Sequence, residues 1–277
     1  MTWQSDDIPE THKITPLGWV RVIVRGVLVG TLTFGCLALL LLVRLFERPL
    51  FGQGRPVTPY ITQFVCRSAF ILMGIGYSRV GTPMRGAGAV VANHSSWLDI
   101  FALNAAARIY FVSKSEVATW PGIGWLARAT GTVFIARDRA QAAKQVAVFR
   151  NRLSYGHKLL FFPEGTSTDG QQVLVFKPTL FAAFFDDALR DTLAIQPVSV
   201  IYTAPQGADV RHYGWWGDMD FGTHLLATLA QSPQGSVTVV YHAPVQVADF
   251  HNRKALAAHV EGIVRASHLD HCGGETR

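Results

Sequence analysis

The chain lacks the features that mark several common protein classes. Its three cysteines, Cys36, Cys66 and Cys272, lie too far apart to indicate a disulfide framework or a zinc site. Charged residues make up 16% of the 277 residues, and lysines and arginines form no long basic run despite a net charge of +6. There is no Gly-x-Ser-x-Gly motif and no internal repeat. We therefore expect no metal site and no nucleic-acid partner.

Apolar sequence is plentiful, at 49% of the chain. Residues 26–43, GVLVGTLTFGCLALLLLV, carry no charge, and such a run is close to the minimum of about 17 residues that crosses a bilayer core. A signal peptide fits poorly, because acidic residues precede the run and no Ala-x-Ala cleavage pattern follows it. We expect this run to span the membrane or to lie in one leaflet.

A second apolar stretch, residues 64–80, is interrupted by Arg67. It is either an amphipathic or re-entrant partner of the first run or an ordinary packed helix. Basic residues flank the first run on both sides, which fits a hairpin dipping into the cytoplasmic leaflet better than a single span. The net positive charge would favour an anionic membrane surface.

From about residue 86 onward, strand-like and helix-like segments alternate, which is typical of an α/β domain with a mostly parallel, buried sheet. The expected strands are residues 89–92, 109–113, 132–136, 158–162, 195–202 and 237–242. The expected helices are residues 97–107, 140–153, 178–188, 224–229 and 254–266, with Asp138 as the cap of the second.

Residues 92–100, ANHSSWLDI, follow the first of these strands and contain His94 and Asp99. In one helix, residues five apart face about 140° away from each other, so the pair cannot meet on a single helical face. They can meet if His94 lies in the turn after the strand and Asp99 in the following helix, capped by Asn93, Ser95 or Ser96. A single His-x-x-x-x-Asp match often arises by chance in a chain with 10 histidines, so the match alone does not identify a site.

Two further stretches carry polar residues at strand ends. In KLLFFPEGTSTDG, residues 158–170, Gly165 would let the backbone approach whatever Glu164 and the hydroxyls after it contact, although a plain turn explains it equally well. In GTVFIARDR, residues 131–139, Arg137 ends an apolar strand, either in a polar cleft or as a solvated strand end.

Taken together, NHSSWLD, GTVFIAR, FFPEGTS and IQPVSV resemble, in order and spacing, the four sequence blocks of the glycerolipid acyltransferase family, which includes bacterial 1-acyl-sn-glycerol-3-phosphate acyltransferases. WWGDMDFGTHLL at 215–226 and NRKALA at 252–257 are similar to the bacterial branch that contains lyso-ornithine lipid acyltransferases. The resemblance implies an α/β acyltransferase domain at residues 81–270, with a mostly parallel central sheet flanked by helices. Residues 1–80 would form a tail and a membrane-embedded helical hairpin.

The resemblance also implies the chemistry. His94 would be the general base that activates a lysolipid hydroxyl, and Asp99 would orient its imidazole. The acyl donor would be a thioester of acyl carrier protein or coenzyme A, with no bound cofactor and no protein nucleophile. Ser95 and Ser96 would cap the helix, and backbone amides after His94 or around Gly165 would stabilise the oxyanion.

Seven residues would bind substrate by the same resemblance. Lys114 and Lys177, which match positions where related sequences are basic, are otherwise ordinary strand-end or loop lysines, and Pro197 would shape the site from the fourth block. Those expected to line the acceptor headgroup pocket are Arg137, Glu164, Gly165 and Thr166.

The position after Pro-Glu-Gly-Thr departs from the pattern. Members that act on glycerol phosphate usually carry a basic residue there, whereas this chain has Ser167. Arginine binds phosphate through two charge-assisted hydrogen bonds, so its absence favours lyso-ornithine lipid over lysophosphatidic acid, unless the enzyme accepts both. The expected location is the bacterial inner membrane, with the catalytic domain facing the cytoplasm.

Other functional classes predict different behaviour. A non-catalytic lipid-binding protein of the same fold would not depend on His94 and Asp99. A membrane hydrolase using Ser95 would form an acyl-enzyme, but a serine next to its histidine has poor geometry for proton transfer. A transporter is disfavoured because it would need several membrane-spanning segments, and only one apolar run in the sequence is long enough to span a membrane.

Overall fold

The computed structural model of the chain describes residues 3–5, 13–120, 122–135 and 142–272. Within these ranges eight strands form one sheet in the order β1-β7-β6-β2-β5-β3-β4, and β8 pairs with β6. The strands are β1 (Gly76–Val80), β2 (Gly88–Ala92), β3 (Tyr110–Lys114), β4 (Val133–Ile135), β5 (Lys158–Phe161), β6 (Ala194–Thr203), β7 (Ser236–Tyr241) and β8 (Val245–Gln246). The α-helices are α1 (Pro16–Phe51), α2 (Thr58–Met73), α3 (Asp99–Ala106), α4 (Ile123–Thr130), α5 (Ala142–Ser154), α6 (Asp187–Arg190), α7 (Phe221–Ala230) and α8 (Arg253–Cys272). The 3₁₀ helices are η1 (Ser115–Thr119), η3 (Pro178–Phe185) and η4 (Val247–Asp249).

Most strand pairs in the sheet are parallel. β2 pairs in parallel with β5 and β6, and β3 pairs in parallel with β4 and β5. β7 and β8 run antiparallel to β6, and β1 is parallel to β7 at the sheet edge. Every residue of β2 is buried, as expected for a parallel strand covered on both faces. The predicted mostly parallel sheet flanked by helices is confirmed.

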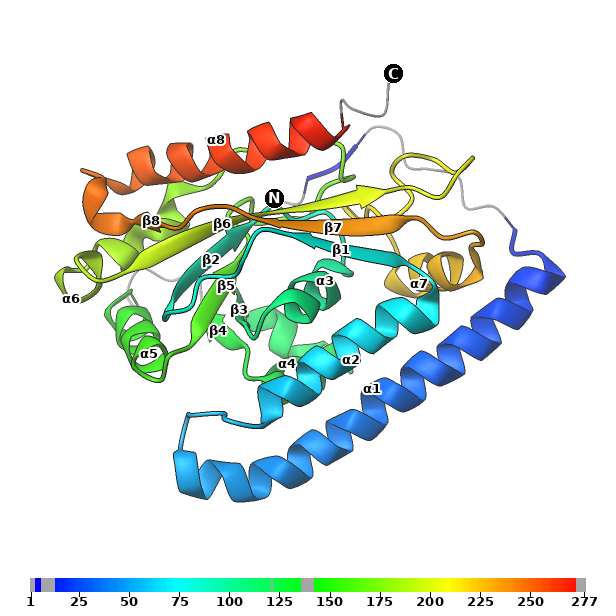
Figure 1. Cartoon of the computed structure of the whole chain (residues 1–277), viewed down its shortest axis with the longest axis horizontal. Coiled ribbons are helices and arrows are strands. Elements are labelled where there is room, and N and C mark those ends of the chain that lie inside the picture. The colour runs from blue at the N-terminus through cyan, green and yellow to red at the C-terminus, as the bar shows by residue number, and fades with distance from the viewer. Residues whose placement is uncertain (1–2, 6–12, 121, 136–141, 273–277) are drawn as a thin grey trace.

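Helices cover both faces of the sheet and create two cores (Figure 1). On one face, α2, α3 and α7 pack against the sheet, with Phe70, Leu103 and Val198 among the buried residues. On the other face, α8 and η3 pack against the strands, with Phe161 and Phe181 in the core. The sheet is therefore the middle layer, and its strand ends are left open for a site.

α1 and α2 form an antiparallel hairpin alongside the first of these faces (Figure 1). α1 begins at a Thr15 cap, whose side chain accepts from the Gly18 amide, and Pro16 occupies its first turn. Buried Glu47 accepts hydrogen bonds from the Thr58 amide and hydroxyl, which joins the end of α1 to the start of α2. Arg25 donates to the carbonyl of Leu229 at 2.8 Å, so α1 is fixed to the end of α7.

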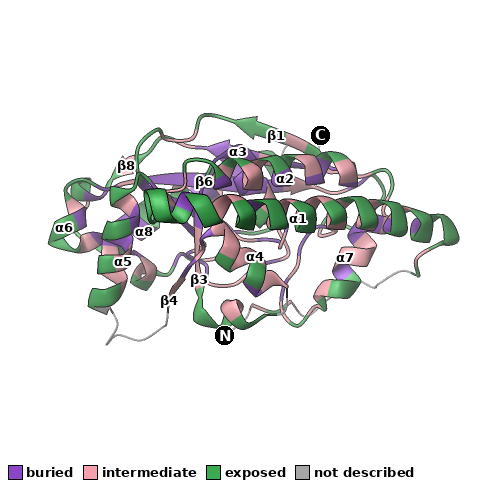
Figure 2. Cartoon of the chain, turned by 90° about the horizontal axis from the view of Figure 1, so that it is seen from below, coloured by how far each residue is buried: buried purple, intermediate pink, exposed green. Residues whose placement is uncertain are grey.

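The outer face of α1 is apolar and exposed (Figure 2). Within the described ranges it is the one helix long and apolar enough to cross a membrane, and in its most apolar 18 residues only 6% of positions are buried. At about 1.5 Å per residue, its 36 residues extend about 54 Å. A soluble protein rarely exposes an apolar surface of this length, so the face needs an apolar environment.

Several expected boundaries were wrong. The second apolar stretch does not form one segment: α2 ends at Met73, Gly74 adopts a left-handed conformation, and residues 76–80 form the edge strand β1. The expected helix at 178–188 is a 3₁₀ helix followed by the short α6. α4, β1 and β8 were not predicted, and Asp138 lies outside the described residues. The division into domains at residue 80 stays a prediction, although β1 belongs to the sheet.

Candidate active site

Two loops meet at the carboxyl-terminal ends of the central strands because β2 and β5 are parallel neighbours. β2 and β5 pair with Val91 opposite Phe161, so both strands end at the same edge. The loop after β2 begins at Asn93, and the loop after β5 begins at Phe162. The carboxyl ends of parallel strands are where α/β proteins place ligands. The first and third of the quoted sequence blocks are thus brought together by the sheet.

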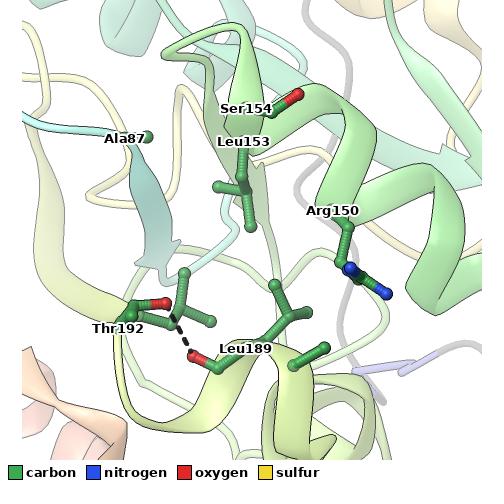
Figure 3. A pocket seen from close by; sticks show the side chains of 8 residues that line it. Ala87, Arg150, Leu153, Ser154, Leu189 and Thr192 are labelled. Carbon is green, nitrogen blue, oxygen red and sulfur yellow. Dashed lines mark hydrogen bonds between the residues drawn. The ribbon is translucent and has the colours of Figure 1, made fainter.

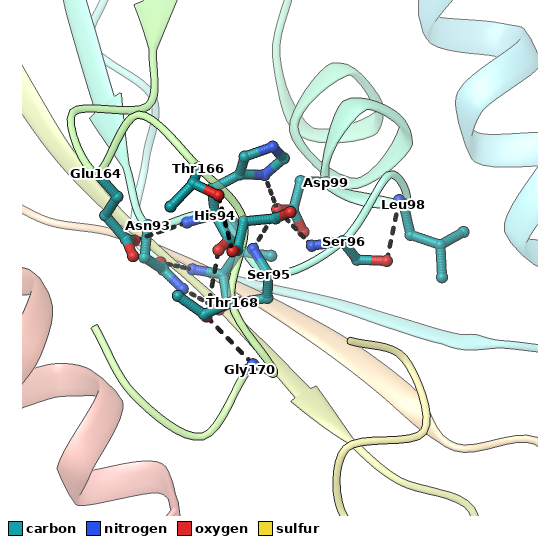
Figure 4. A network of polar contacts seen from close by, with 12 residues as sticks. Asn93, His94, Ser95, Ser96, Leu98, Asp99, Glu164, Thr166, Thr168 and Gly170 are labelled. Atoms are coloured by element: carbon teal, nitrogen blue, oxygen red, sulfur yellow. Dashed lines mark hydrogen bonds and ion pairs between the residues drawn. The ribbon is translucent and has the colours of Figure 1, made fainter. Parts of the chain in front are cut away.

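His94 and Asp99 are paired, as the sequence predicted. His94 Nδ1 lies 2.7 Å from Asp99 Oδ2, with the histidine in the turn after β2 and the aspartate at the first residue of α3 (Figure 4). The Asp99 side chain is 0% exposed and that of His94 is 21% exposed. Because Nδ1 is engaged by the carboxylate, Nε2 is the ring nitrogen available for another contact.

The Asp99 carboxylate accepts hydrogen bonds at both oxygens. Oδ2 accepts from the backbone amides of Ser95 at 2.8 Å and Ser96 at 3.1 Å, in addition to its contact with His94. Oδ1 accepts from the hydroxyl of Tyr202 at 2.7 Å. With partners on both oxygens, the carboxylate is held in a fixed orientation beside the imidazole.

Of the three expected helix caps, the contacts support Ser96, whose carbonyl also accepts from the Asp99 amide at 3.2 Å. α3 has no side-chain cap at its N-cap residue, Leu98, and the Asp99 carboxylate folds back onto the preceding amides instead. Asn93 bonds the Val200 carbonyl and amide through its side chain, which ties the loop to β6. Ser96 Oγ does accept from the Leu98 amide at 3.3 Å. The short helix α3 therefore starts at Asp99, whose carboxylate contacts the preceding turn.

Glu164 holds the two loops together. Its Oε1 accepts from the His94 amide at 2.9 Å, and its Oε2 accepts from the Leu174 amide at 3.1 Å. The residue is 1% exposed. Burial raises the pKa of the Glu164 carboxyl to about 8, although the two amides act in the opposite direction. Its carboxylate therefore faces the protein backbone, and its expected contact with the acceptor headgroup stays a prediction.

The rest of the His94 turn is also fixed. The imidazole stacks on the Phe162 ring, with centroids 4.0 Å apart and planes 10° apart. The His94 carbonyl accepts from the Thr168 amide at 3.0 Å, and the Ser95 carbonyl accepts from the Trp215 amide at 2.8 Å. The histidine is thus held by the ring, by its backbone and by Asp99.

Gly165 and Lys177 lie in contact on the outer side of the third block. Gly165 has φ +73°, and a Cβ added there would lie 2.7 Å from Lys177 Nζ. The Lys177 amide donates to the Pro163 carbonyl, and its side chain is exposed. Thr166 accepts from the backbone amide of Trp3 at 3.3 Å. The structure thus places the Lys177 ammonium group beside Gly165, next to Thr166 in the chain.

The other expected substrate-binding residues are less central. Lys114 ends β3 at the same edge of the sheet and is exposed. Pro197 pairs with Val91 inside the sheet and is buried, so it lies below the loops and not among them. Arg137 lies outside the described residues.

The backbone amides expected to stabilise an oxyanion are already engaged. Those of Ser95 and Ser96 donate to Asp99, and that of Gly165 donates to the Phe162 carbonyl. The hydroxyl of Ser95 is buried and, within the described residues, has no hydrogen-bond partner. Without a base in contact, it is poorly suited to act as a nucleophile.

A separate hollow lies at the opposite end of β2 (Figure 3). Ala87 precedes β2 and lines the hollow, whereas His94 follows that strand. The other lining residues come from α5 and from the α6 region: Arg150, Leu153, Ser154, Ala188, Leu189, Thr192 and Leu193. This hollow is therefore not part of the histidine site.

Comparisons with known proteins agree with this geometry. A family model described as Acyltransferase matches residues 80–201, which include the loops after β2 and β5. A lyso-ornithine lipid O-acyltransferase of Rhodobacter capsulatus is 55% identical over 264 residues, covering 95% of this chain and 96% of that protein. This chain belongs to the acyltransferase family.

Other relatives of this acyltransferase extend the comparison. A lyso-ornithine lipid O-acyltransferase of Brucella abortus is 35% identical, over 78% of this chain and 82% of that protein. The crystal structure of a 1-acyl-sn-glycerophosphate (LPA) acyltransferase from Thermotoga maritima superposes with a TM-score of 0.58, covering 91% of this chain and 98% of that chain. At 21% identity, this likeness supports the fold.

Tyr202 and Phe162 are the residues of the acyltransferase site that the sequence analysis missed. Phe162 was visible as the residue directly after β5, in the same block as Glu164. Tyr202 lies near the end of β6, and its position beside Asp99 depends on β6 being the neighbour of β2. Strand order is not written in the local sequence, so no local signal pointed to Tyr202.

Proposed function

We propose that this acyltransferase moves a fatty acyl group from an acyl thioester onto the free hydroxyl of lyso-ornithine lipid. The observation that carries the proposal is the His94–Asp99 pair, with Nδ1 held by a buried carboxylate at 2.7 Å and the ring partly exposed. This arrangement suits a base that removes one proton from a hydroxyl. The reaction needs no metal and no bound cofactor.

The proposed mechanism is direct transfer. His94 Nε2 takes the proton of the lysolipid hydroxyl as the hydroxyl oxygen attacks the thioester carbonyl. Asp99 stabilises the imidazolium that forms, as the aspartate of a serine-protease triad does. The tetrahedral intermediate then collapses, the carbon–sulfur bond breaks, and the imidazolium returns the proton to the sulfur. The products are the acylated lipid and the free thiol of acyl carrier protein or coenzyme A.

The choice of acceptor rests on the third block and on the relatives. Ser167 stands where a phosphate-binding arginine would be expected, and its side chain is buried. Lys177 supplies one positive charge beside Gly165, which suits the carboxylate of an amino-acid headgroup. Two relatives that cover most of the chain are named lyso-ornithine lipid O-acyltransferases. 1-Acyl-sn-glycerol-3-phosphate is the lesser candidate, supported by sequence relatives that are named 1-acyl-sn-glycerol-3-phosphate acyltransferases.

The proposed location is the bacterial cytoplasmic membrane, with the catalytic domain on the cytoplasmic side. Its support is the exposed apolar face of α1, which continues onto exposed Tyr60 and Phe64 of α2. If the α1–α2 hairpin lies in one leaflet, lipid covers this apolar face and the histidine site stays near the lipid headgroups. Acyl carrier protein and coenzyme A thioesters would then reach the site from the aqueous side.

The test is an acyl-transfer assay on the purified full-length protein. Lyso-ornithine lipid and 1-acylglycerol-3-phosphate are offered separately, each with acyl-carrier-protein and coenzyme A donors, to the wild type and to His94→Ala. The expected result is His94-dependent acylation with kcat/KM at least tenfold higher for lyso-ornithine lipid. A preference for the phosphate acceptor would overturn the assigned lipid. Equal activity of His94→Ala would overturn the mechanism.

A further inference from the structure

The two oxygens of the Asp99 carboxylate have partners of different origin. Oδ2 contacts groups that are its neighbours in sequence: the imidazole of His94 and the amides of Ser95 and Ser96. Oδ1 receives its hydrogen bond from Tyr202, which is 103 residues away in the chain, at 2.7 Å. The local turn therefore supplies the partners of Oδ2, and a distant strand supplies the partner of Oδ1.

Sheet pairing explains how Tyr202 reaches Asp99. β6 runs parallel to β2 with Val198 opposite Ala92, and the Asn93 side chain continues this pairing as far as Val200. Side chains alternate along a strand, so Tyr202 projects from the same face of β6 as Val198 and Val200. That face is the one covered by α3, whose first residue is Asp99.

The Tyr202 ring is held from its other side. Its centroid lies 5.5 Å from that of Tyr213. The Tyr213 hydroxyl donates to Gln234 and accepts from the Gly235 amide, so it makes no use of Asp99. Tyr202 and Tyr213 are thus adjacent, and the hydroxyl of each is hydrogen-bonded. They differ in their partners: Tyr202 contacts the Asp99 carboxylate, whereas Tyr213 contacts Gln234 and Gly235.

We propose that Tyr202 is a positioning residue for acyl transfer, which holds Asp99 so that Oδ2 faces His94 and which withdraws negative charge from that carboxylate. The inference rests on the proposed role of His94 as the base. The partners of Oδ2 hold one corner of the carboxylate, and a donor fixed at Oδ1 further limits rotation of the group about its Cβ–Cγ bond. A carboxylate that accepts an additional hydrogen bond is also less basic, so the proton taken from the substrate stays on the imidazole.

The role has a signature in the pH dependence. The groups that face His94 are Asp99 from α3, the Glu164 carboxyl from the loop after β5, and, through Asp99, the Tyr202 hydroxyl from β6. The Lys177 ammonium stands beyond Gly165. Removing the Tyr202 hydroxyl leaves the other groups in place, and without this donor more negative charge stays on the carboxylate oxygens of Asp99. The imidazolium is then stabilised, and the acidic limb of the kcat/KM profile should move to higher pH.

The test compares Tyr202→Phe with Tyr213→Phe, which removes a hydroxyl from the adjacent ring without touching Asp99. For Tyr202→Phe we expect kcat to fall about tenfold, both KM values to stay within twofold, and the acidic limb to shift upward. For Tyr213→Phe we expect lower thermal stability and an unshifted limb. An unshifted limb in Tyr202→Phe, or equal effects in both variants, would overturn the proposal.

A second measurement covers the case in which Tyr202→Phe does not fold. Fluorotyrosine placed at position 202 keeps the ring and makes its hydroxyl a stronger donor, so the acidic limb should move to lower pH. No shift in that protein would overturn the positioning role. His94→Ala is assayed alongside: full activity in that variant would overturn the proposed base itself, whatever the tyrosine variants do.

Discussion

The backbone amide of His94 donates to Glu164 Oε1 at 2.9 Å, although the two residues are 70 positions apart in the chain. The contact joins the turn after β2 to the turn after β5. Glu164 is buried, and its other oxygen accepts from the Leu174 amide. Glu164 therefore links the proposed base to the proposed acceptor-binding loop, and a change in either is expected to affect both.

Glu164 should make the stability of the protein depend on pH. Burial raises its pKa to about 8 in the folded state from its usual 4.5. Between these values the folded protein keeps a proton that the unfolded chain releases, so the contribution is fully present below pH 4.5 and is lost as the pH rises through 8. We expect stability to fall by a few kcal/mol across this window, at about 1.4 kcal/mol per pKa unit.

Thermal unfolding of detergent-purified protein at pH 5.5 and pH 8.5 measures this effect. Glu164→Gln cannot titrate and should show a smaller difference between the two pH values than the wild type. Glu261→Gln is the matched control, because Glu261 also accepts a backbone amide, that of Phe176 at 2.9 Å, but lies on α8. If Glu164→Gln keeps the full pH dependence, Glu164 is not its source.

Gly165→Ala should impair acceptor binding more than it impairs folding. A residue with a side chain at φ +73° costs about 1 kcal/mol, and the new Cβ would displace the Lys177 ammonium. Gly207→Ala is the control: Gly207 has φ +78°, and no atom lies within 4 Å of the Cβ built there. Both variants should lose similar stability, whereas KM for the lysolipid should rise severalfold in Gly165→Ala alone. Equal KM values would show that Lys177 does not contact the acceptor.

Asp99→Asn should reduce kcat by about 10² to 10⁴ without dissociating the protein from membranes. In asparagine an NH2 donor replaces one of the two oxygens, so either Tyr202 or the Ser95 and Ser96 amides lose their acceptor. The imidazole also loses the negative charge that would stabilise its protonated form. Asp220→Asn is the control, since Asp220 also accepts a backbone amide at a helix start, that of Thr223 at 2.7 Å. A wild-type rate in Asp99→Asn would remove the aspartate from the mechanism.

The sequence predicted those parts of the site that are local in the chain. His94 and Asp99 lie in one turn, so their pairing followed from a strand that ends before the histidine and a helix that starts near the aspartate. Glu164 and Gly165 follow a strand, but a plain turn explained them equally well, and they were singled out by the resemblance of their block to the glycerolipid acyltransferase family. The use of Glu164 as a brace for the His94 amide was not predicted, because it depends on β2 and β5 being neighbours.

The wrong boundaries also have physical causes. Residues 76–80 continue an apolar stretch, and their strand conformation is set by pairing with β7, which lies 160 residues later. The Asp99 carboxylate reaches the amides of Ser95 and Ser96 by folding back over a short turn, a contact that the sequence analysis did not predict. Tertiary pairing and side-chain reach decided both cases, and neither can be read from periodicity.

The outer face of α1 should bind lipid bilayers, and a charge placed on it should weaken that binding. Leu45 is 67% exposed on α1, and Leu269 is 61% exposed on α8, which covers the opposite face of the sheet (Figure 1). Burying a leucine side chain in an apolar environment contributes about 2 kcal/mol, and a glutamate there is unfavourable, so Leu45→Glu should lower partition into anionic vesicles at least tenfold. Leu269→Glu should bind as the wild type does. Vesicle flotation at fixed ionic strength measures both, and equal binding of the two variants would mean that α1 does not lie in the bilayer.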